Sequence, residues 1–402
     1  MSTWTSRIKN SIWPSHMPIP SPGSGASSWE ADVCNIFPRI KERMLETPQD
    51  PVHHAEGDVW THTKMVIDCL LSESGYAALP QAIRGVMFYS ALLHDVSKPE
   101  TTKHNGDRVI APGHSARGAV FSRRLLWEQG VDFYLREQVC RLIEVHQVPF
   151  FAFSNRKNLS SEFLVRQMSC DRSLDLLTLL ATSDMKGRVC PDQNKVLDDI
   201  ALFREQAKEL SCLDQPYPFP DSATRIAYIT SQGQRYPDQA VFQKDPFEVI
   251  MMSGLPASGK NTWIKLNSEL PVVSYDDIRA KMGIRYGRGT GSIVHAADDQ
   301  IREHLRKKKS FIINGTHLSR QMRRRQIELI RNYGGQVKVV YCEAEHGELI
   351  ERNSSRDTSL SNSKLMGMTS RWEVPGLDEV ESVHHQIKPL PLSKYTSPKI
   401  SL

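Results

Sequence analysis

The spacing of apolar residues changes near residue 247 of this 402-residue chain. Between about 29 and 212, apolar residues recur at intervals of three and four, as at Val59, Val66 and Leu70, which is typical of amphipathic helices. Beyond 247, helical stretches separate short continuous apolar runs at 249–252, 272–273, 311–313 and 337–341. Buried strands that alternate with helices indicate a parallel sheet. We therefore expect a multidomain protein, an all-α domain followed by an α/β domain with a parallel sheet.

Composition within the chain suggests where these domains begin and end. Residues 1–28 are rich in Ser, Pro and Gly and predict a flexible tail. The helical pattern, in which no strand is recognisable, assigns 29–212 to the all-α domain. Five prolines mark 213–246 as a connector, in which we expect a short helix around Ile226. Residues 247–402 then form the α/β domain.

The bulk composition is that of an ordinary globular protein, with 39% apolar and 24% charged residues and a net charge of +5. Seven cysteines without a CxxC pair indicate reduced thiols in a cytoplasmic protein. No apolar run approaches the roughly 18 residues of a membrane span, and no secretion signal is recognisable. Residues 302–325 hold nine Lys or Arg against one acidic residue. This run is either a phosphate-contacting surface or a solvated helix face.

Ionisable residues interrupt the apolar helix stripes of the first domain. His62, His146 and Asp184 each extend such a stripe, and the pair His94 and Asp95 closes another apolar helix. A carboxylate buried in an apolar interior costs several kcal/mol unless a charge or hydrogen bond meets it. One buried histidine is usually a core residue, but several with carboxylates predict a metal site. These ligands suit divalent manganese, cobalt, nickel, iron or zinc.

The segments around these residues, 58–63, 92–99, 113–119 and 183–188, resemble an HD phosphohydrolase domain, most closely the branch found with tRNA nucleotidyltransferases. The resemblance assigns this domain to 29–212 and implies that His62, His94, Asp95 and Asp184 bind metal. It also implies that two further residues hold a second ion, namely His114 and His146. Lys98 resembles a lysine that contacts phosphate in the family, although an exposed lysine is the alternative. Such a centre activates water and binds phosphate oxygens.

A phosphate-binding loop follows the apolar run at 249–252. Its residues are Gly254, Leu255, Pro256, Ala257, Ser258, Gly259, Lys260, Asn261 and Thr262. A GxxxxGK sequence between a strand and a helix predicts that backbone amides cradle the phosphates of ATP or another NTP, with Mg²⁺, and that Lys260 reaches the β- and γ-phosphates. Asn261 stands where Ser or Thr usually contacts the ion. It could bind Mg²⁺ through its amide or through water, and Thr262 could assist.

Polar residues after the second strand, at 274–279, are similar to those of phage and bacterial 5′-OH polynucleotide kinases. Ligands of α/β sheets collect beyond the carboxyl ends of strands, where a carboxylate can act as general base. The similarity implies that Asp276 is this base and that Arg279 holds a phosphate of the acceptor strand. Asp277 could be the base instead, with Asp276 as an N-cap.

Two further segments resemble the same kinases. Residues 313–318 are similar to an N-A-T-N-L stretch of the family, with Gly315 and His317 as departures. Residues 351–357 resemble the lid. There, Arg352 and Arg356 lie four apart on one helix face, and the resemblance implies that they hold the donor phosphates and stabilise developing charge.

The order of the modules resembles bifunctional bacterial HD-polynucleotide kinases over about 30–390. The resemblance implies that the kinase phosphorylates 5′-OH ends of RNA or DNA, and that the HD domain removes 2′-phosphate or 2′,3′-cyclic phosphate at RNA 3′ ends. A nucleic-acid ligase would then act downstream, and no membrane is involved. A homodimer is compatible with the sequence, which leaves the oligomeric state open. Two alternatives remain, a small-molecule kinase fused to a nucleotide phosphohydrolase and a non-catalytic nucleotide sensor.

Overall fold

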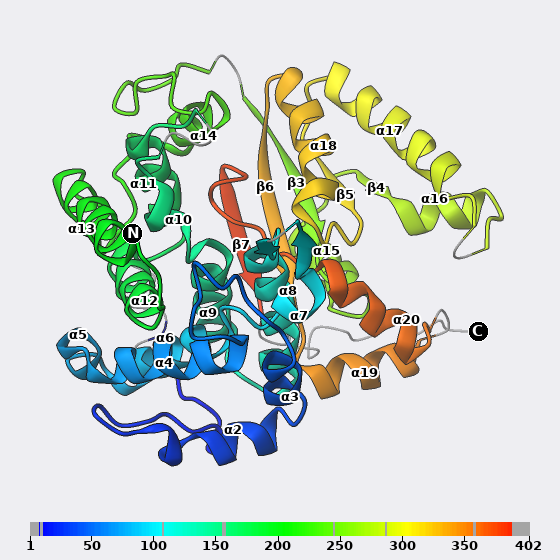
Figure 1. Cartoon of the computed structure of the whole chain (residues 1–402). Helices are drawn as coiled ribbons and strands as arrows, with labels where there is room; N and C mark the ends of the chain where they lie inside the picture. The colour runs from blue at the N-terminus through cyan, green and yellow to red at the C-terminus, as the bar shows by residue number, and fades with distance from the viewer. Residues whose placement is uncertain are drawn as a thin grey trace. The chain divides into compact units, whose positions relative to one another are not determined.

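The chain forms two compact units, one ending at Ala240 and the other beginning at Val241 (Figure 1). The computed structural model describes residues 8, 11–106, 108–154, 158–243, 246–285, 288–356 and 359–387. Parts of the predicted tail (1–7, 9 and 10) and of the predicted α/β domain (388–402) therefore lie outside the described residues. None of the helices in the described part is both long and apolar enough to cross a membrane.

The first unit is helical. Its helices are η1 (Ala26–Ser28), α2 (Glu30–Ile36), α3 (Ile40–Leu45), α4 (Val59–Ser72), α5 (Ser74–Ala77), α6 (Gln81–Leu93), α7 (Lys98–Thr101), α8 (His114–Glu128), α9 (Phe133–Val145), α10 (Val148–Phe151), α11 (Ser161–Ser169), α12 (Leu174–Lys186), α13 (Gln193–Glu209) and α14 (Ser222–Thr230). The predicted stripe of Val59, Val66 and Leu70 is fully buried in α4. Helices α4, α6 and α12 pack against one another, and α9 packs on α6 and α12. This core brings together the helices on which the predicted metal ligands lie.

A β-hairpin interrupts the helices, so the prediction of a strand-free domain was wrong. Strands β1 (Lys103–Asn105) and β2 (Arg108–Ile110) pair antiparallel. Each has only three residues and is largely exposed, so neither carries an apolar alternation. The signal available in the sequence was Gly106, which directly follows β1 and has a φ of 61°.

The described part of the predicted flexible tail packs on the helical unit. Trp13 and Met17 are buried, and the Nε1 of Trp13 donates to the carbonyl of Ala82 at 2.9 Å. The Trp13 ring stacks on Tyr89 with centroids 4.7 Å apart, and it lies so close to Gly85 that any Cβ there would collide with it. One well-placed aromatic side chain thus anchors a segment whose composition alone indicates disorder.

The predicted connector contains the expected helix around Ile226, which is α14. Asp221 caps it by accepting a hydrogen bond from the backbone nitrogen of Thr224 at 2.7 Å. Ile226 is buried.

The second unit is an α/β domain. Its elements are β3 (Phe247–Ser253), α15 (Lys260–Asn267), β4 (Val272–Ser274), α16 (Tyr275–Lys281), α17 (Thr290–Arg306), β5 (Phe311–Asn314), α18 (Arg320–Asn332), β6 (Gly335–Cys342), α19 (His346–Ser354), α20 (Asn362–Gly367), η2 (Met368–Arg371) and β7 (Ser382–Gln386). The five strands are parallel and follow the order β4-β5-β3-β6-β7. The four apolar runs correspond to β3 to β6. The edge strand β7 was not predicted, because Ser, His and Gln dominate it.

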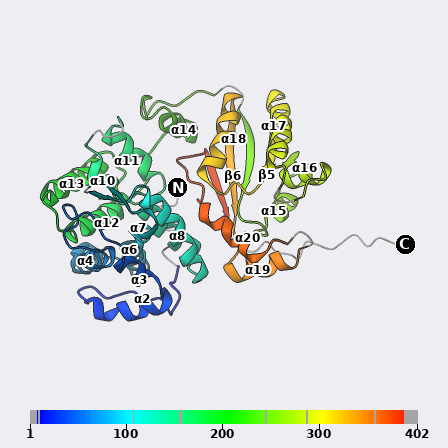
Figure 2. The same cartoon turned by 45° about the vertical axis from the view of Figure 1, so that its right-hand side comes forward.

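Both faces of the central strand β3 are buried. Val249 and Met251 pack on the face covered by α16, α17 and α18, whereas Ile250 and Met252 pack on the face covered by α15 (Figures 1 and 2). This burial explains why β3 is a continuous apolar run rather than an alternating one. Because β3 lies between β5 and β6, the loop after it sits where the strand order reverses, which is where α/β sheets bind ligands.

The packing of the N-terminal segment can be tested with Trp13→Ala. We expect this change to destabilise the helical unit by about 3–5 kcal/mol, because a buried tryptophan is lost. The matched control is Ile12→Ala, since Ile12 is 85% exposed and should be nearly neutral. Urea unfolding followed by circular dichroism measures both, and equal midpoints for the two variants would contradict the observed packing.

Candidate functional sites

The six residues predicted as metal ligands come together in the core of the helical unit. Their ligand atoms fall into three overlapping groups, each with all atoms within 4.8 Å, namely His62 with His94 and Asp95, His94 with His146 and Asp184, and Asp95 with His114 and His146. All six residues are buried. Helix α4 supplies His62, α12 supplies Asp184, α8 begins with His114, and His94 and His146 are the C-caps that directly follow α6 and α9. We call this set the helical cluster.

Three of its histidines are oriented in the same way. The Nδ1 of His94 lies 2.7 Å from the carbonyl oxygen of Ala91, and His114 and His146 make the same contact with the residue three positions earlier, at 2.7 and 2.8 Å. A carbonyl only accepts, so Nδ1 carries the proton and donates. Each ring therefore points its Nε2 into the cluster. Metal-binding histidines are usually oriented by such a second hydrogen bond.

His62 is oriented by a carboxylate that the sequence analysis missed. Its Nδ1 lies 2.9 Å from the Oε1 of Glu56, which is also 2.8 Å from the Nδ1 of His54. The other oxygen of Glu56 accepts from the backbone nitrogen of Val189 at 2.9 Å. Burial favours a raised pKa for Glu56, but the hydrogen bonds from His54 and His62 outweigh it and lower the pKa. Glu56 and His54 lie in a loop, where no helical period could mark them.

The carboxylates of the cluster are ionised although they are buried. Burial would raise the pKa of Asp95, but the charge of Lys98 and the contact with His94 hold it well below its usual range. Arg188, 3.0 Å from Asp184, and His62 have the same effect on the pKa of Asp184. Burial also lowers the pKa of His146 to about 3, so this ring stays neutral.

The donor set fits a divalent metal ion. Asp95 Oδ1, Asp184 Oδ2 and His146 Nε2 are buried without a hydrogen-bond partner among the described residues. Unsatisfied buried acceptors are rare in proteins, and these three belong to residues whose ligand atoms already lie together. Neutral imidazoles and ionised carboxylates are the forms in which these side chains bind metal.

Lys98 is buried rather than exposed, so the alternative of a solvated lysine was wrong. Its Nζ lies 2.7 Å from Asp95 Oδ2 and donates to Gln49 Oε1 at 2.5 Å. A cation at this position is close enough to the helical cluster to meet an anionic ligand there.

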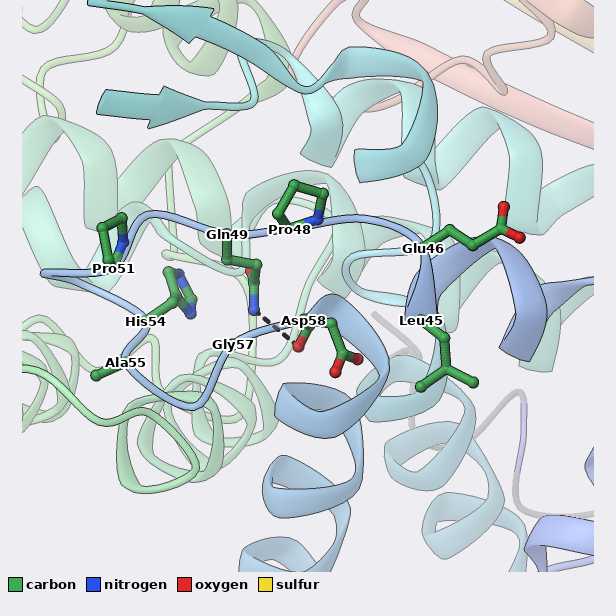
Figure 3. Close-up of a pocket in the computed structure, with 9 residues that line it drawn as sticks. All are labelled: Leu45, Glu46, Pro48, Gln49, Pro51, His54, Ala55, Gly57 and Asp58. Atoms are coloured by element: carbon green, nitrogen blue, oxygen red, sulfur yellow. Dashed lines mark hydrogen bonds between the residues drawn. The ribbon is translucent and has the colours of Figure 1, made fainter. Parts of the chain in front are cut away.

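An open pocket of about 610 Å³ lies beside the helical cluster (Figure 3). It is lined by Leu45, Glu46, Pro48, Gln49, Pro51, His54, Ala55, Gly57 and Asp58. Two of these residues touch the surroundings of the cluster. Gln49 binds Lys98, and the His54 ring meets the His62 ring edge to face with centroids 4.8 Å apart. The volume suits a ligand of nucleotide size.

The predicted phosphate-binding loop connects β3 to α15. Gly254 has a φ of 141° and approaches the carbonyl oxygen of Cys342 so closely that a Cβ would collide with it, and Gly259 has a φ of 99°. Both positions therefore require glycine. The Nζ of Lys260 donates to the carbonyls of Gly254 and Leu255 at 2.9 and 2.8 Å. Burial lowers the pKa of Lys260 to about 8.

Asn261, at the position usually held by Ser or Thr, is engaged with β5. Its Oδ1 accepts a hydrogen bond from the Nδ2 of Asn314 at 2.9 Å. Asn314 ends β5, so this contact ties the start of α15 to the neighbouring strand. The sequence suggested that Asn261 and Thr262 could assist the ion, and in this arrangement one lone pair of the Asn261 oxygen is already used.

The carboxylate of Asp276 lies within electrostatic range of Lys260, where its charge opposes the lowering of the lysine pKa by burial. Asp276 is not the N-cap of α16, because Ser274 accepts from the backbone nitrogen of Asp277 at 3.2 Å. The alternative in which Asp276 caps the helix was therefore wrong. Arg279 lies one turn further along α16 and is half-buried.

The two departures from the N-A-T-N-L stretch occur together for a steric reason. A Cβ on residue 315 would lie only 2.8 Å from the His317 ring, which is too close for two carbon atoms. His317 therefore requires glycine at position 315. His317 itself donates from Nδ1 to the carbonyl of Met252 at 2.7 Å, next to the phosphate-binding loop. Burial lowers its pKa to about 4.

The two lid arginines also lie near the loop. A Cβ on Gly259 would be 3.9 Å from Nη1 of Arg352, which pairs with Glu348 one turn earlier on α19. The charge of Arg356 contributes to the lowered pKa of Lys260, after the effect of burial. Arg356 is the last described residue before a gap, and Asp357 lies outside the described residues.

The basic run at 302–325 does not form an unpaired cationic surface. Six of its nine basic residues have acidic partners in the structure, and these are Arg302, Lys307, Arg320, Arg323, Arg324 and Arg325. Arg323 is fully buried and pairs with Glu379. The partners of Arg320, Arg323 and Arg325 are distant in sequence, so a local count of charge could not reveal them.

Comparison with known proteins supports an α/β domain of P-loop type in the second unit. Residues 249–375 match the model of the AAA domain family. The chain is also 32% identical over 93 residues, 23% of its length, to a multifunctional CCA protein of Halorhodospira halophila, and the matched part spans about 20% of that relative. A crystal structure of a candidate kinase from Chloroflexus aurantiacus aligns with 37% of this chain and 87% of its own, at 19% identity. Its TM-score of 0.31 is too low to support an argument.

Glu56 should control the metal affinity of the helical cluster. A glutamine at this position has one acceptor oxygen for three donors, from His54, His62 and Val189. We therefore expect Glu56→Gln to weaken binding of Mn²⁺, Ni²⁺ or Zn²⁺ by about 10- to 100-fold. Equilibrium dialysis followed by elemental analysis measures the bound metal. The control is His53→Ala, since His53 adjoins the site without belonging to it. Equal affinities in Glu56→Gln and wild type would exclude the proposed orienting role.

Proposed function

We propose that the protein heals nucleic-acid ends with two separate active sites. The P-loop unit transfers a phosphoryl group from an NTP to a 5′-OH end of RNA or DNA. The helical unit removes 2′-phosphate or 2′,3′-cyclic phosphate from RNA 3′ ends. The observation that supports the proposal is that each unit brings together candidate phosphate-handling groups, a buried cluster with unsatisfied ligand atoms in the first and Lys260 with Asp276, Arg352 and Arg356 in the second.

In the kinase reaction, Lys260 and the loop amides bind the β- and γ-phosphates of the donor. Asp276 accepts the proton of the attacking 5′-hydroxyl, whose oxygen forms a bond to the γ-phosphorus as the bond to the β-phosphate oxygen breaks. The NTP leaves as NDP. Arg352 and Arg356 stabilise the charge that develops on the transferred group. Arg279 holds a phosphate of the acceptor strand.

In the hydrolytic reaction, His62, His94, Asp95 and Asp184 would hold a divalent metal ion, with His114 and His146 available for a second. The ion supplies activation of water and binding of phosphate oxygens when it is present. Lys98, which the structure holds against Asp95, provides a positive charge for a phosphate oxygen. Glu56 and the carbonyls of Ala91, Ala111 and Ile143 keep the imidazoles in the tautomer that binds metal.

Two observations bear on the substrate class. The similarity to a relative named for CCA, a nucleotide sequence, supports a nucleic-acid substrate. Most basic residues at 302–325 pair with carboxylates, which leaves less positive charge to bind the phosphates of a polynucleotide. This pairing favours the second candidate, a small-molecule kinase fused to a nucleotide phosphohydrolase. A non-catalytic sensor has no need of a carboxylate beside Lys260.

The decisive experiment supplies the purified protein with two labelled RNA oligonucleotides, one with a 5′-OH and one with a 2′,3′-cyclic phosphate. ATP with Mg²⁺ is added to the first, and Mn²⁺, Co²⁺, Ni²⁺ or Zn²⁺ to the second. We expect phosphorylation of the first and phosphate removal from the second, both resolved on denaturing gels. Activity on nucleosides and nucleotides alone would favour the second candidate instead.

Asp276→Ala should reduce kinase turnover by about 100- to 10,000-fold, because a general base acts in the transition state. ATP affinity should change little. The matched control is Asp277→Ala at the neighbouring exposed carboxylate. Steady-state kinetics gives turnover, and calorimetry gives ATP affinity. If Asp277→Ala shows the larger loss, the roles of the two residues are reversed.

The two activities should be separable by mutation, because their residues belong to different compact units. His94→Ala should abolish phosphate removal and leave 5′-kinase activity near the wild-type rate. Lys260→Ala should give the converse pattern, whereas Lys265→Ala, one turn beyond the loop, should have little effect on either activity. Both activities are measured on each variant after circular dichroism confirms its fold. Loss of both activities in a folded His94→Ala protein would contradict two independent sites.

A further inference from the structure

The hairpin β1–β2 contacts the segment that lines the pocket beside the helical cluster. Asp50, in the segment that lines the pocket, accepts from the backbone nitrogen of Val109 in β2 at 3.3 Å, and the Nε of Arg108 lies 3.8 Å from the same oxygen. The hairpin is the pair of strands drawn above the pocket in Figure 3. A ligand that leaves the pocket on this side therefore meets the hairpin.

The pocket is suited to a nucleotide. Leu45, Pro48 and Pro51 provide apolar surface for a base, whereas Gln49 and His54 provide polar groups. Gln49 and His54 are also the residues that connect the pocket to Lys98 and His62. A nucleotide seated here would have its base on the outer wall and its phosphate toward the cluster.

The hairpin presents two cations on one face. In its register Asn105 pairs with Arg108, and Lys103 precedes Asn105 by two residues. Paired residues and residues two apart share a face of a β-ribbon, so Lys103 and Arg108 point to the same side. The Arg108 side chain is 67% exposed, so its contact with Asp50 is weak. Asp107 lies outside the described residues.

We propose that the pocket receives the 3′-terminal nucleotide of a single-stranded RNA, and that Lys103 and Arg108 bind the backbone phosphates of the nucleotides before it. This inference rests on the proposed phosphohydrolase function and extends it, because it names the pocket for the terminal nucleotide and the hairpin cations that would hold the RNA chain before it. The cations on the hairpin have no role for a ligand confined to the pocket, whereas a chain that continues out of the pocket requires a contact of this kind.

The test compares two substrates with the same reactive end, a nucleoside 2′,3′-cyclic phosphate and a short single-stranded RNA ending in that group. For Lys103→Gln/Arg108→Gln, we expect kcat/KM to fall about tenfold on the RNA and less than about twofold on the mononucleotide. The single variant Lys103→Gln, which leaves the Asp50 contact intact, should show the same preference with a smaller loss. Lys195→Gln/Lys208→Gln on α13 is the control of equal charge.

Binding is measured separately, by fluorescence anisotropy with RNA whose 5′ end carries the dye and is therefore no kinase substrate. The double variant should bind more weakly and reduce the slope of log affinity against log salt by about two, one for each phosphate contact. Equal kinetic losses on both substrates, or RNA binding no weaker than in the control, would overturn the proposal. If the wild type processes neither substrate, the phosphohydrolase function fails, and the anisotropy result alone decides the role of the hairpin.

Discussion

The ionised carboxylates Asp95 and Asp184 are the constraint on which the helical unit depends. Two negative charges in the centre of an apolar core cost several kcal/mol each unless other charges and hydrogen bonds compensate them. Lys98, Arg188 and the surrounding imidazoles supply this compensation. They belong to α4, α6, α7, α8 and α12 or to residues that adjoin these helices. The apolar stripes of the helices determine how they pack, and the packing determines which polar groups meet. Core and site are therefore built by the same contacts.

In the second unit, the central strand β3 fixes the position of the phosphate-binding loop. Because β3 is buried on both faces, its carboxyl end is fixed, and Gly254 can pass within contact distance of the backbone of β6. The loop then begins at a rigid point. Three residues at and just after the end of β5 make hydrogen bonds around it, Asn314 with Asn261, Thr316 with Gly254 and His317 with Met252. The position of Lys260 follows from backbone geometry more than from any single side chain.

The sequence predicted what periodicity and local motifs encode. It predicted the helices around His62 and His146, the strands β3 to β6 and the convergence of six residues from five segments. It missed Glu56 and His54, whose loop has no period, and the hairpin, whose strands are too short to show one. It left open whether the run at 302–325 is a phosphate-contacting surface or a solvated helix face, because Asp298, Asp378 and Glu379, which pair with Arg325, Arg320 and Arg323, come from other parts of the fold. In this last case the missing information lay in contacts between distant segments, which a local count of charge cannot reveal.

The use of backbone carbonyls to orient His94, His114 and His146 has a consequence for evolution. The acceptors belong to Ala91, Ala111 and Ile143, but every residue type carries the same carbonyl oxygen, so substitution of these three side chains leaves the hydrogen bonds in place. The sequence around the three histidines can therefore drift without disturbing their rings. His62 is different, since its closest acceptor is the side chain of Glu56, which a single nucleotide change can remove. The site is thus unevenly tolerant of mutation, and selection on the side chains that orient its histidines should fall mainly on the loop that carries Glu56.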